Sequence, residues 1–408
     1  MKNTRRIIWD ILNRVILEQA YASLLMRSLP QDLSRPDIGF ISEIVYGTLR
    51  NKDFLELQWR NLARGKVRPK TAVLLDFSVY QLLFTDRVPS YAVISQAVDL
   101  VPPRDKGFVN AILRAVQKRG RIDPVETGLE GAAIRTSHPL FLLRMWAKQY
   151  GEDKAIAIAE QDQKPAAVYA RRNPLKLSAE ELAAQGIATI EGDCFRFQPD
   201  VVPAQWLSEG KIIIQGRSSQ KVVPYLDAKS GMRVMDVCSA PGTKAQQIAA
   251  AMNNEGEILA YDIYPERVKL IDSLMARTGV SIVKAQVRDG TKELEAGSPL
   301  FDRILIDAPC SGLGDLSHKP EIRFHITPQS LDALSALQKK LLDVNARYLK
   351  AGGRLVYSTC TLNKKENEKQ VQSFLLAHDD FRLIEEHTMF PMDEESDGFY
   401  VAVMERAG

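Results

Sequence analysis

The stretch RVMDVCSAPGTK, residues 233–244, decides the fold class of this chain. It opens with a short apolar run and continues through small residues and a proline, and residues 244–252 then follow a helical pattern. A strand that passes through a tight turn into a helix is the repeating unit of a doubly wound α/β sheet. Small turn residues also allow main-chain N–H groups at the start of the helix to approach a ligand closely.

The rest of the C-terminal half repeats this alternation of strand and helix. Four further strands are expected at residues 257–262, 281–287, 301–308 and 353–359, and a helix is expected over residues 265–278. Successive parallel strands joined by helices predict an α/β fold with a Rossmann-like sheet. The turn has neither the GxGxxG spacing nor a Gly-Lys-Ser/Thr ending, which disfavours both a dinucleotide and a nucleoside triphosphate.

Acidic residues follow the second and third expected strands. Asp262 ends the second strand, where a carboxylate can accept hydrogen bonds from ribose hydroxyls, and Asp289 follows the third, where a carboxylate can meet an adenine amino group. A small-residue turn together with two acids suits the adenosine part of S-adenosylmethionine. The alternative is that each aspartate only caps a neighbouring helix, as loop aspartates often do.

Two of the four cysteines lie just beyond the next two strands. The fourth strand runs into DAPCSG, with Asp307 and Cys310, and the fifth runs into STCTLNKKENE, with Cys360. Ligands of open α/β sheets bind at the carboxyl ends of parallel strands. A single cysteine there would most simply be a small buried apolar residue. Two cysteines on facing loops, beside a carboxylate, favour a chemical role instead.

Residues 1–120 predict a different kind of domain, made of helices. Apolar residues recur at helical spacing from Ile7 to Ile16, over residues 40–62 and over residues 71–84. The segments ISEIVYGTLRN, SYAVISQAVDL and KGFVNAILRAVQKRG resemble the NusB-type RNA-binding fold. This region has 19 Lys and Arg against 11 Asp and Glu, a balance of +8 in a chain whose net charge is +3. Such a balance favours a polyanionic partner, most often a nucleic acid.

The chain as a whole resembles one family when these motifs are combined. The runs DVCSAPGTK, DAPCSG, GGRLVYSTCTLNKKENE and ESDGFYVAVMER are similar to those of RNA cytosine-C5 methyltransferases, and the NusB-type region makes the chain similar to Sun/RsmB-type ribosomal RNA methyltransferases. The resemblance implies an α/β, Rossmann-like methyltransferase sheet, an all-α NusB-like domain and a small α/β extension. It also implies methyl transfer from S-adenosylmethionine to C5 of a cytosine in small-subunit (16S) ribosomal RNA, through a covalent cysteine–C6 adduct.

The resemblance further implies a role for each motif residue. Cys360 would attack C6 of the cytosine, Cys310 would assist release of the methylated base, and Asp307 would hold and polarise the cytosine. The cofactor would be bound by Cys238, Ser239, Ala240, Pro241, Gly242, Thr243, Lys244, Asp262, Arg267, Asp289 and Asp307. A free thiol with a pKa near 8.5 is only a few per cent ionised at neutral pH. Lys244 and Arg323 are therefore candidate cations for favouring the Cys360 thiolate.

Three stretches depart from the pattern of this family. Thr243 stands where a second glycine is usual, which affects how closely the turn's backbone can approach the cofactor. The run SHKPEIRF replaces Arg-Arg-x-Pro-Asp-x-x-Trp, so Ser317 and His318 stand in place of arginines and alter the expected RNA contacts rather than the chemistry. The run KKEN, residues 364–367, replaces Pro-Glu-Glu-Asn and adds local positive charge.

Domain divisions and surroundings follow from the same patterns. We expect a NusB-like RNA-binding domain over residues 1–125, connector helices with the α/β extension over 126–215, and the catalytic domain over 216–408. Cys238 is expected to shape the turn and Cys194 to be structural. Four cysteines without a CxxC pair or zinc spacing predict reduced thiols, a cytoplasmic location and no metal site. No uncharged stretch is long enough to span a membrane, and a monomer is expected.

Two other functions compete with this interpretation. The same chemistry could act on transfer RNA, although a NusB-type region favours ribosomal RNA. The chain could also be a non-catalytic RNA-binding or assembly protein, although the two cysteines and three acids disfavour this. Salt-dependent phosphate contacts are expected from basic residues of the N-terminal region as a group. The candidates are Arg14, Arg50, Arg114, Lys118 and Arg119.

Overall fold

The computed structural model describes residues 4–86 and 88–408, and the chain folds into two compact units. The first, called here the helical unit, comprises Met1–Pro165 and Leu316–Ile326. The second, the sheet unit, comprises Ala166–Asp315 and Thr327–Gly408. The helical unit is therefore discontinuous in sequence, because it takes one short segment from the C-terminal half. The expected three-part division at residues 125 and 215 stays a prediction.

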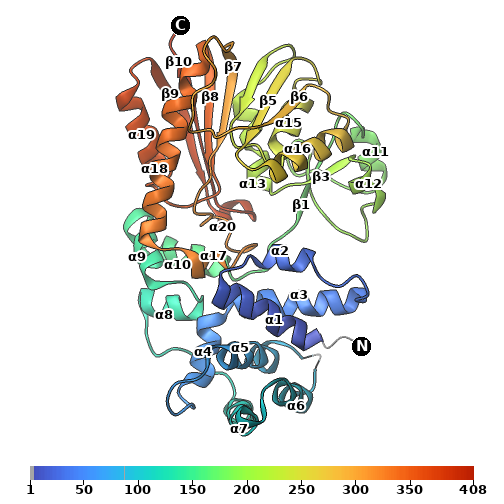
Figure 1. The fold of residues 1–408 in the computed structure, drawn as a ribbon, viewed down its shortest axis with the longest axis vertical. Helices are drawn as coiled ribbons and strands as arrows, with labels where there is room; N and C mark the ends of the chain where they lie inside the picture. The colour runs from blue at the N-terminus through green and yellow to red at the C-terminus, as the bar shows by residue number, and fades with distance from the viewer. Residues whose placement is uncertain (1–3, 87) are drawn as a thin grey trace. The chain divides into compact units, whose positions relative to one another are not determined.

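The helical unit contains no strand among its described residues (Figure 1). Its helices are α1 (Thr4–Glu18), α2 (Ala22–Arg27), α3 (Arg35–Arg50), α4 (Lys52–Arg60), α5 (Pro69–Phe84), α6 (Ser90–Leu100), α7 (Pro103–Arg119), α8 (Gly128–Arg135), α9 (Leu140–Tyr150), α10 (Glu152–Gln161) and α17 (Ile322–His325). The helical pattern over residues 40–62 is divided between α3 and α4, because the Asn51 side chain donates to the Gly47 carbonyl at 2.9 Å and ends α3. Helix α5 is buried along most of its length and forms the centre of this core.

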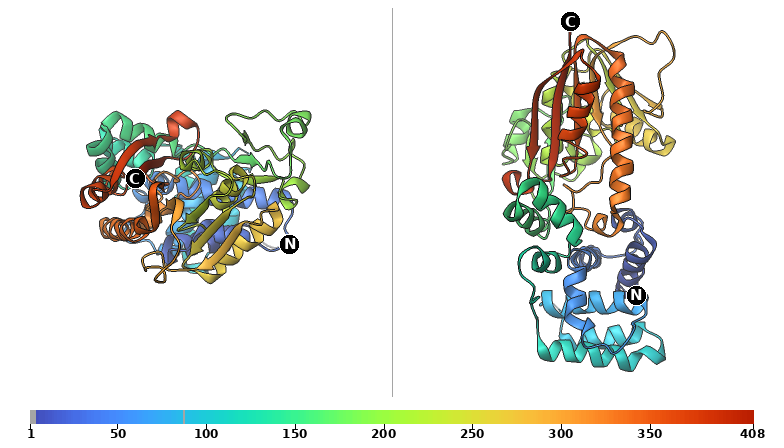
Figure 2. Two further views of the ribbon diagram at one scale, coloured as in Figure 1. Left: turned by 90° about the horizontal axis from the view of Figure 1, so that it is seen from above. Right: turned by 90° about the vertical axis from the view of Figure 1, so that its left-hand side faces the viewer.

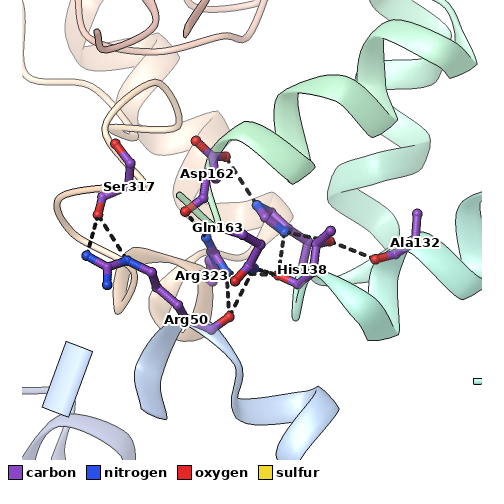
Figure 3. A network of polar contacts seen from close by, with 8 residues as sticks. Arg50, Ala132, His138, Asp162, Gln163, Ser317 and Arg323 are labelled. Atoms are coloured by element: carbon purple, nitrogen blue, oxygen red, sulfur yellow. Dashed lines mark hydrogen bonds and ion pairs between the residues drawn. The ribbon is translucent and has the colours of Figure 1, made fainter. Parts of the chain in front are cut away.

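Helix α17 lies within a network of buried polar groups in the helical unit (Figure 3). Arg323 is 1% exposed, and its terminal nitrogens donate to the main-chain oxygens of Arg50, Thr136 and Asp162 at 2.9–3.4 Å. The ring of His138 lies 3.2 Å from the Asp162 carboxylate. Burial lowers the pKa of His138 well below its usual value, so the positive charge beside Asp162 comes from Arg323.

The sheet unit begins with a small antiparallel sheet of order β2-β1-β3. Its elements are β1 (Tyr169–Arg172), α11 (Ala179–Ala184), β2 (Cys194–Arg196), α12 (Gln205–Ser208) and β3 (Ile212–Ile214). This is the small α/β extension that the strand-like runs VYARRN and KIIIQG predict. From β1, buried Arg171 donates to the Thr243 carbonyl at 3.3 Å and to the Gln246 side chain at 2.5 Å. The extension thus braces the first turn of the helix that follows the 233–244 motif.

A seven-stranded sheet of order β6-β5-β4-β7-β8-β10-β9 dominates the sheet unit (Figure 1). Its strands are β4 (Arg233–Asp236), β5 (Glu257–Asp262), β6 (Val283–Val287), β7 (Phe301–Asp307), β8 (Leu349–Thr359), β9 (Phe381–Met389) and β10 (Phe399–Arg406). The first five are parallel, as the alternation predicts. The last two were not expected as strands, and β10 pairs antiparallel with both β8 and β9.

Helices cover both faces of this sheet (Figure 2). They are α13 (Arg217–Gln220), α14 (Val222–Leu226), α15 (Thr243–Ala251), α16 (Pro265–Thr278), α18 (Pro328–Asn345), 3-10 helix η1 (Ala346–Tyr348), α19 (Glu368–Ala377) and α20 (Pro391–Glu394). Alternate residues of each strand join different cores: Val234 packs with α14, α15 and α16, whereas Met235 packs with α18 and α19. Burial of both faces explains why these strands read as continuous apolar runs. No helix among the described residues is both long and apolar enough to cross a bilayer.

Candidate active site

The turn between β4 and α15 requires glycine at one position. Gly242 has φ +100°, and a Cβ atom there would lie 3.2 Å from side-chain carbons of Ile271 and Met275 on α16. Both the left-handed backbone and the close packing of α16 therefore select glycine. Thr243 is the first residue of α15 and has ordinary helical backbone. The family's second glycine is thus replaced at a position where this chain needs no conformational freedom.

A cavity of about 210 Å³ opens beside this turn, at the carboxyl ends of the central strands. Its lining combines the turn with the end of β7, the residue after β8 and the start of β10, which lie 63 or more positions beyond the turn in the sequence. The lining residues are Ser219, Asp236, Cys238, Ser239, Ala240, Pro241, Thr243, Lys244, Asp307, Asp315, Cys360, Asp397 and Phe399. The structure therefore brings together the predicted cofactor turn, the predicted base-binding carboxylate and one of the two predicted thiols.

Asp236 is a site residue that the sequence analysis did not single out. It is the last residue of β4, it is fully buried, and neither of its carboxylate oxygens has a hydrogen-bond partner among the described residues. The neighbouring Ser239 hydroxyl is the polar side chain that acts on this carboxylate most strongly, and it partly offsets the effect of burial. Burial raises the pKa of Asp236 to about 7. An acid ending an otherwise apolar strand was the available sequence signal, and it marks a place for a ligand that carries N–H donors.

The other predicted cofactor residues lie on neighbouring loops. Asp262 ends β5 and forms an ion pair of 3.2 Å with Arg267, whose guanidinium also donates to the Ala240 carbonyl at 3.0 Å. Arg267 thereby ties the second strand end to the turn. Asp289 follows β6 and accepts hydrogen bonds from the main chain and hydroxyl of Thr291 at 2.9 and 2.7 Å. Asp289 therefore shapes its own loop, and neither acid lines the 210 Å³ cavity.

Lys244 and Asp307 form an ion pair inside the cavity. The Lys244 Nζ lies 2.6 Å from Asp307 Oδ2, and the Ser358 hydroxyl donates to Asp307 Oδ1 at 2.8 Å. The ammonium also lies 5.2 Å from the centre of the Phe399 ring, on strand β10. Lys244 was a candidate for favouring a thiolate, and its closest charge partner in the structure is the Asp307 carboxylate.

The two predicted thiols lie side by side. Cys310 and Cys360 follow the carboxyl ends of β7 and β8, and their sulfur atoms are 3.3 Å apart. The hydrogen bond to Cys360, together with burial, raises the pKa of Cys310 well above its usual value. Either sulfur can donate in this contact. Cys360 is the member that lines the cavity.

The remaining candidates are held elsewhere. Burial raises the pKa of Cys238, which fits a role in shaping the turn, and Cys194 is buried in the small sheet. The Arg323 guanidinium donates inside the helical unit, so it was not found as a cation of the thiol pair. Among the basic residues expected to contact RNA, Arg50 donates to the Ser317 carbonyl at 3.1 Å and Arg119 to the Asn61 side chain at 3.1 Å.

A doubly wound sheet with this turn, strand-end acids and a strand-end cavity has the features that the resemblance to S-adenosylmethionine-dependent methyltransferases predicts. The family described as 16S rRNA methyltransferase RsmB/F matches residues 223–405, and the NusB family matches residues 2–118. The chain is 34% identical to the probable ribosomal RNA small subunit methyltransferase B of Bacillus subtilis, over the full length of both, and 30% identical to that of Synechocystis, also over the full length of both. The chain therefore belongs to the RsmB/F family.

Solved structures support the same fold. A methyltransferase homologue from Pyrococcus horikoshii is 28% identical, with a TM-score of 0.61 over 68% of this chain and 98% of that one. The NSun6 protein of Pyrococcus horikoshii, solved with SFG, has a TM-score of 0.59 over 66% of this chain and 98% of that one, at 21% identity. The predicted fold class and the predicted cofactor, S-adenosylmethionine, are confirmed.

The unpaired groups in the cavity fit this cofactor. The amino group of its methionine part offers N–H donors and a positive charge, and the buried Asp236 carboxylate lacks both. The small-residue turn leaves room for a ligand beside the N-terminus of α15. Bound there, S-adenosylmethionine supplies an electrophilic methyl group.

Proposed function

We propose that this protein methylates C5 of a cytosine in small-subunit (16S) ribosomal RNA, through a covalent adduct between Cys360 and C6 of the base. The observation that carries the proposal is the pair of sulfur atoms 3.3 Å apart, one of which lines the cofactor cavity. We propose that the turn Cys238–Lys244, with Asp262, Arg267, Asp289 and Asp307, binds the cofactor, and we add Asp236 to this set.

A thiol is required because cytosine C5 is a poor nucleophile. When a thiolate adds at C6, the ring becomes an enamine-like species whose C5 can attack an electrophilic methyl group. This covalent route replaces one difficult step with two easier ones. The target base must also be unstacked, because C5 and C6 within a paired stack are hard to reach.

The positions of the two thiols support different roles. Cys360 lines the cavity, whereas Cys310 does not. The sulfur atoms are 3.3 Å apart, so the Cys310 S–H can donate to a Cys360 thiolate. A hydrogen bond from a neighbouring thiol stabilises a thiolate in the same way as any donor stabilises an anion. This supports Cys360 as the nucleophile.

We propose that Asp307 and Lys244 act on the polar edge of the cytosine. The Asp307 carboxylate accepts hydrogen bonds from Lys244 and Ser358, so its position in the cavity is fixed. A carboxyl group beside N3 and the exocyclic amine holds the base and can donate a proton as the ring gains electrons. The Lys244 ammonium lies at the same place and can replenish that proton.

Release of the product requires a base near C5. The C5 proton passes to the Cys310 sulfur, the C–H electrons form the C5=C6 double bond, and the C6–S bond breaks to regenerate the Cys360 thiolate. Cys310 must first lose its own proton to solvent. A thiol whose pKa is raised is a stronger base once it is ionised, which supports Cys310 in this step.

Ribosomal RNA is the substrate that the N-terminal region favours. The NusB family match, the balance of +8 over residues 1–120 and the names of the full-length relatives all support it. Contacts to phosphates make such binding weaken as salt concentration rises. We propose that Arg14, Arg114 and Lys118 contribute, with Arg50 and Arg119 also supporting the fold.

The test is methylation of small-subunit ribosomal RNA by purified protein, with bisulfite sequencing to locate 5-methylcytosine. Cys360→Ala should lower methyl transfer by about 10³-fold or more while S-adenosylmethionine still binds. Cys310→Ala should accumulate a protein–RNA adduct on a denaturing gel. Normal activity of Cys360→Ala would refute the nucleophile assignment. Methylation of transfer RNA alone would overturn the proposed substrate.

A further inference from the structure

The turn after Cys360 contains two polar residues for which the reaction steps above give no role. Glu366 and Asn367 are both 0% exposed, and they end the KKEN run that departs from the family pattern. Buried polar side chains are retained only when they are well hydrogen-bonded. Their partners therefore show what each side chain does in the protein.

Glu366 holds the residue that follows Cys310. Its carboxylate accepts hydrogen bonds from the Ser311 main-chain N–H at 2.9 Å and from the Ser311 hydroxyl at 2.5 Å. Gln338 of α18 and Asn363 donate to the same carboxylate at 2.9 and 3.0 Å. Four donors on two oxygens fix the carboxylate, and the carboxylate fixes the Cys310 loop.

Asn367 holds both neighbours of Cys360. Its side-chain oxygen accepts from the Thr359 hydroxyl at 2.6 Å, and its side-chain nitrogen donates to the Thr361 main-chain oxygen at 2.9 Å. One planar amide thus restrains the chain on each side of the nucleophile. The contacts of Asn367 lie on the β8 side, whereas Glu366 reaches across to the loop after β7.

The two cysteine loops also contact each other directly. The Ser311 and Thr361 hydroxyl oxygens lie 2.7 Å apart, and the Gly314 main-chain N–H donates to the Cys360 carbonyl at 3.0 Å. Ser311 and Thr361 directly follow the two cysteines, so this contact joins the same two loops as the 3.3 Å contact between the sulfur atoms. The separation of the sulfurs depends on the positions of both loops.

The side chains of Glu366 and Asn367 are not needed to close the turn itself. The main-chain N–H groups of both residues donate to the Asn363 carbonyl at 2.9 and 3.1 Å. The Tyr357 hydroxyl donates to the Glu366 carbonyl oxygen at 2.7 Å. The backbone of the turn is therefore held by other groups, which leaves the two side chains to position the cysteine loops.

We propose that Glu366 and Asn367 are positioning residues with divided tasks, Asn367 for the nucleophile Cys360 and Glu366 for the releasing thiol Cys310. This inference rests on the proposed function. It follows that loss of each side chain slows a different half of the reaction. Loss of Asn367 impairs formation of the adduct, and loss of Glu366 impairs its resolution.

The experiment compares the first turnover, the steady-state rate and the amount of protein–RNA adduct on a denaturing gel. Asn367→Ala should lower adduct formation and first-turnover methyl transfer together, by about tenfold or more.

Glu366→Ala should leave the first turnover within about threefold, slow the steady state about tenfold or more, and accumulate adduct. Glu366→Gln should be milder, because the remaining amide oxygen can still accept from the Ser311 N–H. Ser311→Ala should change the adduct in the same direction as Glu366→Ala.

The control is Asp302→Asn. Asp302 lies at the opposite end of β7 and also bridges two segments, since it accepts from the Arg233 N–H at 2.8 Å and from Lys350 at 2.7 Å. This variant should keep both rates and the adduct level. Binding of S-adenosylmethionine by each variant reports whether the sheet unit is folded. If the alanine variants lose that binding, Glu366→Gln, Ser311→Ala and Asn367→Asp decide the result.

The inference is overturned if the folded Glu366 and Asn367 variants change adduct levels in the same direction, or if neither differs from Asp302→Asn. Opposite changes in adduct level support it, because a merely structural role would lower every step together. Failure of the unaltered protein to form adduct or 5-methylcytosine is a different result. That outcome would refute the proposed function itself.

Discussion

Two buried polar clusters, one in each unit, are organised in opposite ways. In the helical unit, both terminal nitrogens of Arg323 donate to main-chain carbonyls (Figure 3). In the sheet unit, neither oxygen of the buried Asp236 carboxylate has a partner among the described residues. An unpaired buried polar group costs about 1–3 kcal/mol. The first cluster therefore stabilises the fold, whereas the second retains an unpaired charge that a bound ligand can satisfy.

The largest expected effect comes from breaking the Arg323 cluster. Arg323→Met removes a donor from three carbonyls, of which those of Arg50 and Thr136 keep the Gln163 side chain as a donor. It also leaves the Asp162 carboxylate beside a neutral His138. Loss of a buried charge partner typically costs about 3–5 kcal/mol. We expect the free energy of unfolding of the helical unit to fall by this amount, measured by urea denaturation. Arg144→Ala is the control, because its ion pair with Glu130 is exposed and should contribute about 1 kcal/mol or less.

A substitution at Asp236 should have the opposite effect, because it should weaken cofactor binding without lowering stability. Asp236→Asn removes the charge that we assign to the amino group of S-adenosylmethionine, so affinity should fall by about 10–100-fold, as for a lost hydrogen bond between charged groups. Stability of the free protein should stay the same or rise, because an amide is less costly to bury than a carboxylate. Calorimetric titration and thermal unfolding measure the two effects. Unchanged affinity would remove Asp236 from the site.

The third prediction concerns pH. Burial raises the pKa of Asp236 to about 7, so the carboxylate is mostly protonated at pH 5.5 and mostly ionised at pH 7.5. Affinity for the cationic cofactor should therefore rise by about 20-fold over this range, and Asp236→Asn should flatten the curve. Stability of the free protein changes with pH in the opposite direction, since it falls as pH rises. The folded state holds this proton more tightly than the unfolded state, so its stabilising effect is complete below pH 4 and is lost as pH rises through 7.

The smallest expected effects separate the two positions of the cofactor turn. Gly242→Ala places a methyl group 3.2 Å from Ile271 and Met275 on backbone with φ +100°, and should cost about 1–2 kcal/mol of stability. Thr243→Gly should cost less than about 1 kcal/mol, because Thr243 is an ordinary helical residue. Equal losses at the two positions, measured by thermal unfolding, would contradict the view that only Gly242 is constrained.

The sequence predicted those parts of the fold that depend on local pattern. Alternation of apolar runs and helical periods located the five parallel strands, because β4, β5, β7 and β8 are buried on both faces, and β6, which is not buried, lies at the edge of the sheet. It did not reveal β9, whose residues are mostly exposed, and the apolar run at the start of β10 was not recognised as a strand because no helical pattern of the alternation precedes it. The helix boundary at Asn51 was also missed, because a side-chain hydrogen bond ends α3 inside a continuous apolar period.

The sequence motifs predicted which residues form the candidate site, but not the burial and hydrogen-bond partners of its side chains. The motifs located Cys310, Cys360 and Asp307, and the structure brings these residues to neighbouring strand ends. Asp236 was missed because its burial and lack of partners exist only in three dimensions. Arg323 was considered as a cation for the thiols, yet its guanidinium is used by carbonyls of the helical unit. Motif spacing identifies candidate residues, but only the folded structure shows which groups each charged side chain contacts.

The discontinuity of the helical unit has a consequence during protein synthesis. This unit includes Leu316–Ile326, from which Arg323 donates to the carbonyls of Arg50, Thr136 and Asp162. Its first 165 residues leave the ribosome long before that segment is made. At about 5–20 residues per second, the delay is about 10–30 s. For that time the nascent helices lack the Arg323 donor and only Gln163 can donate to the Arg50 and Thr136 carbonyls, and the unit is completed only when most of the sheet unit has been translated.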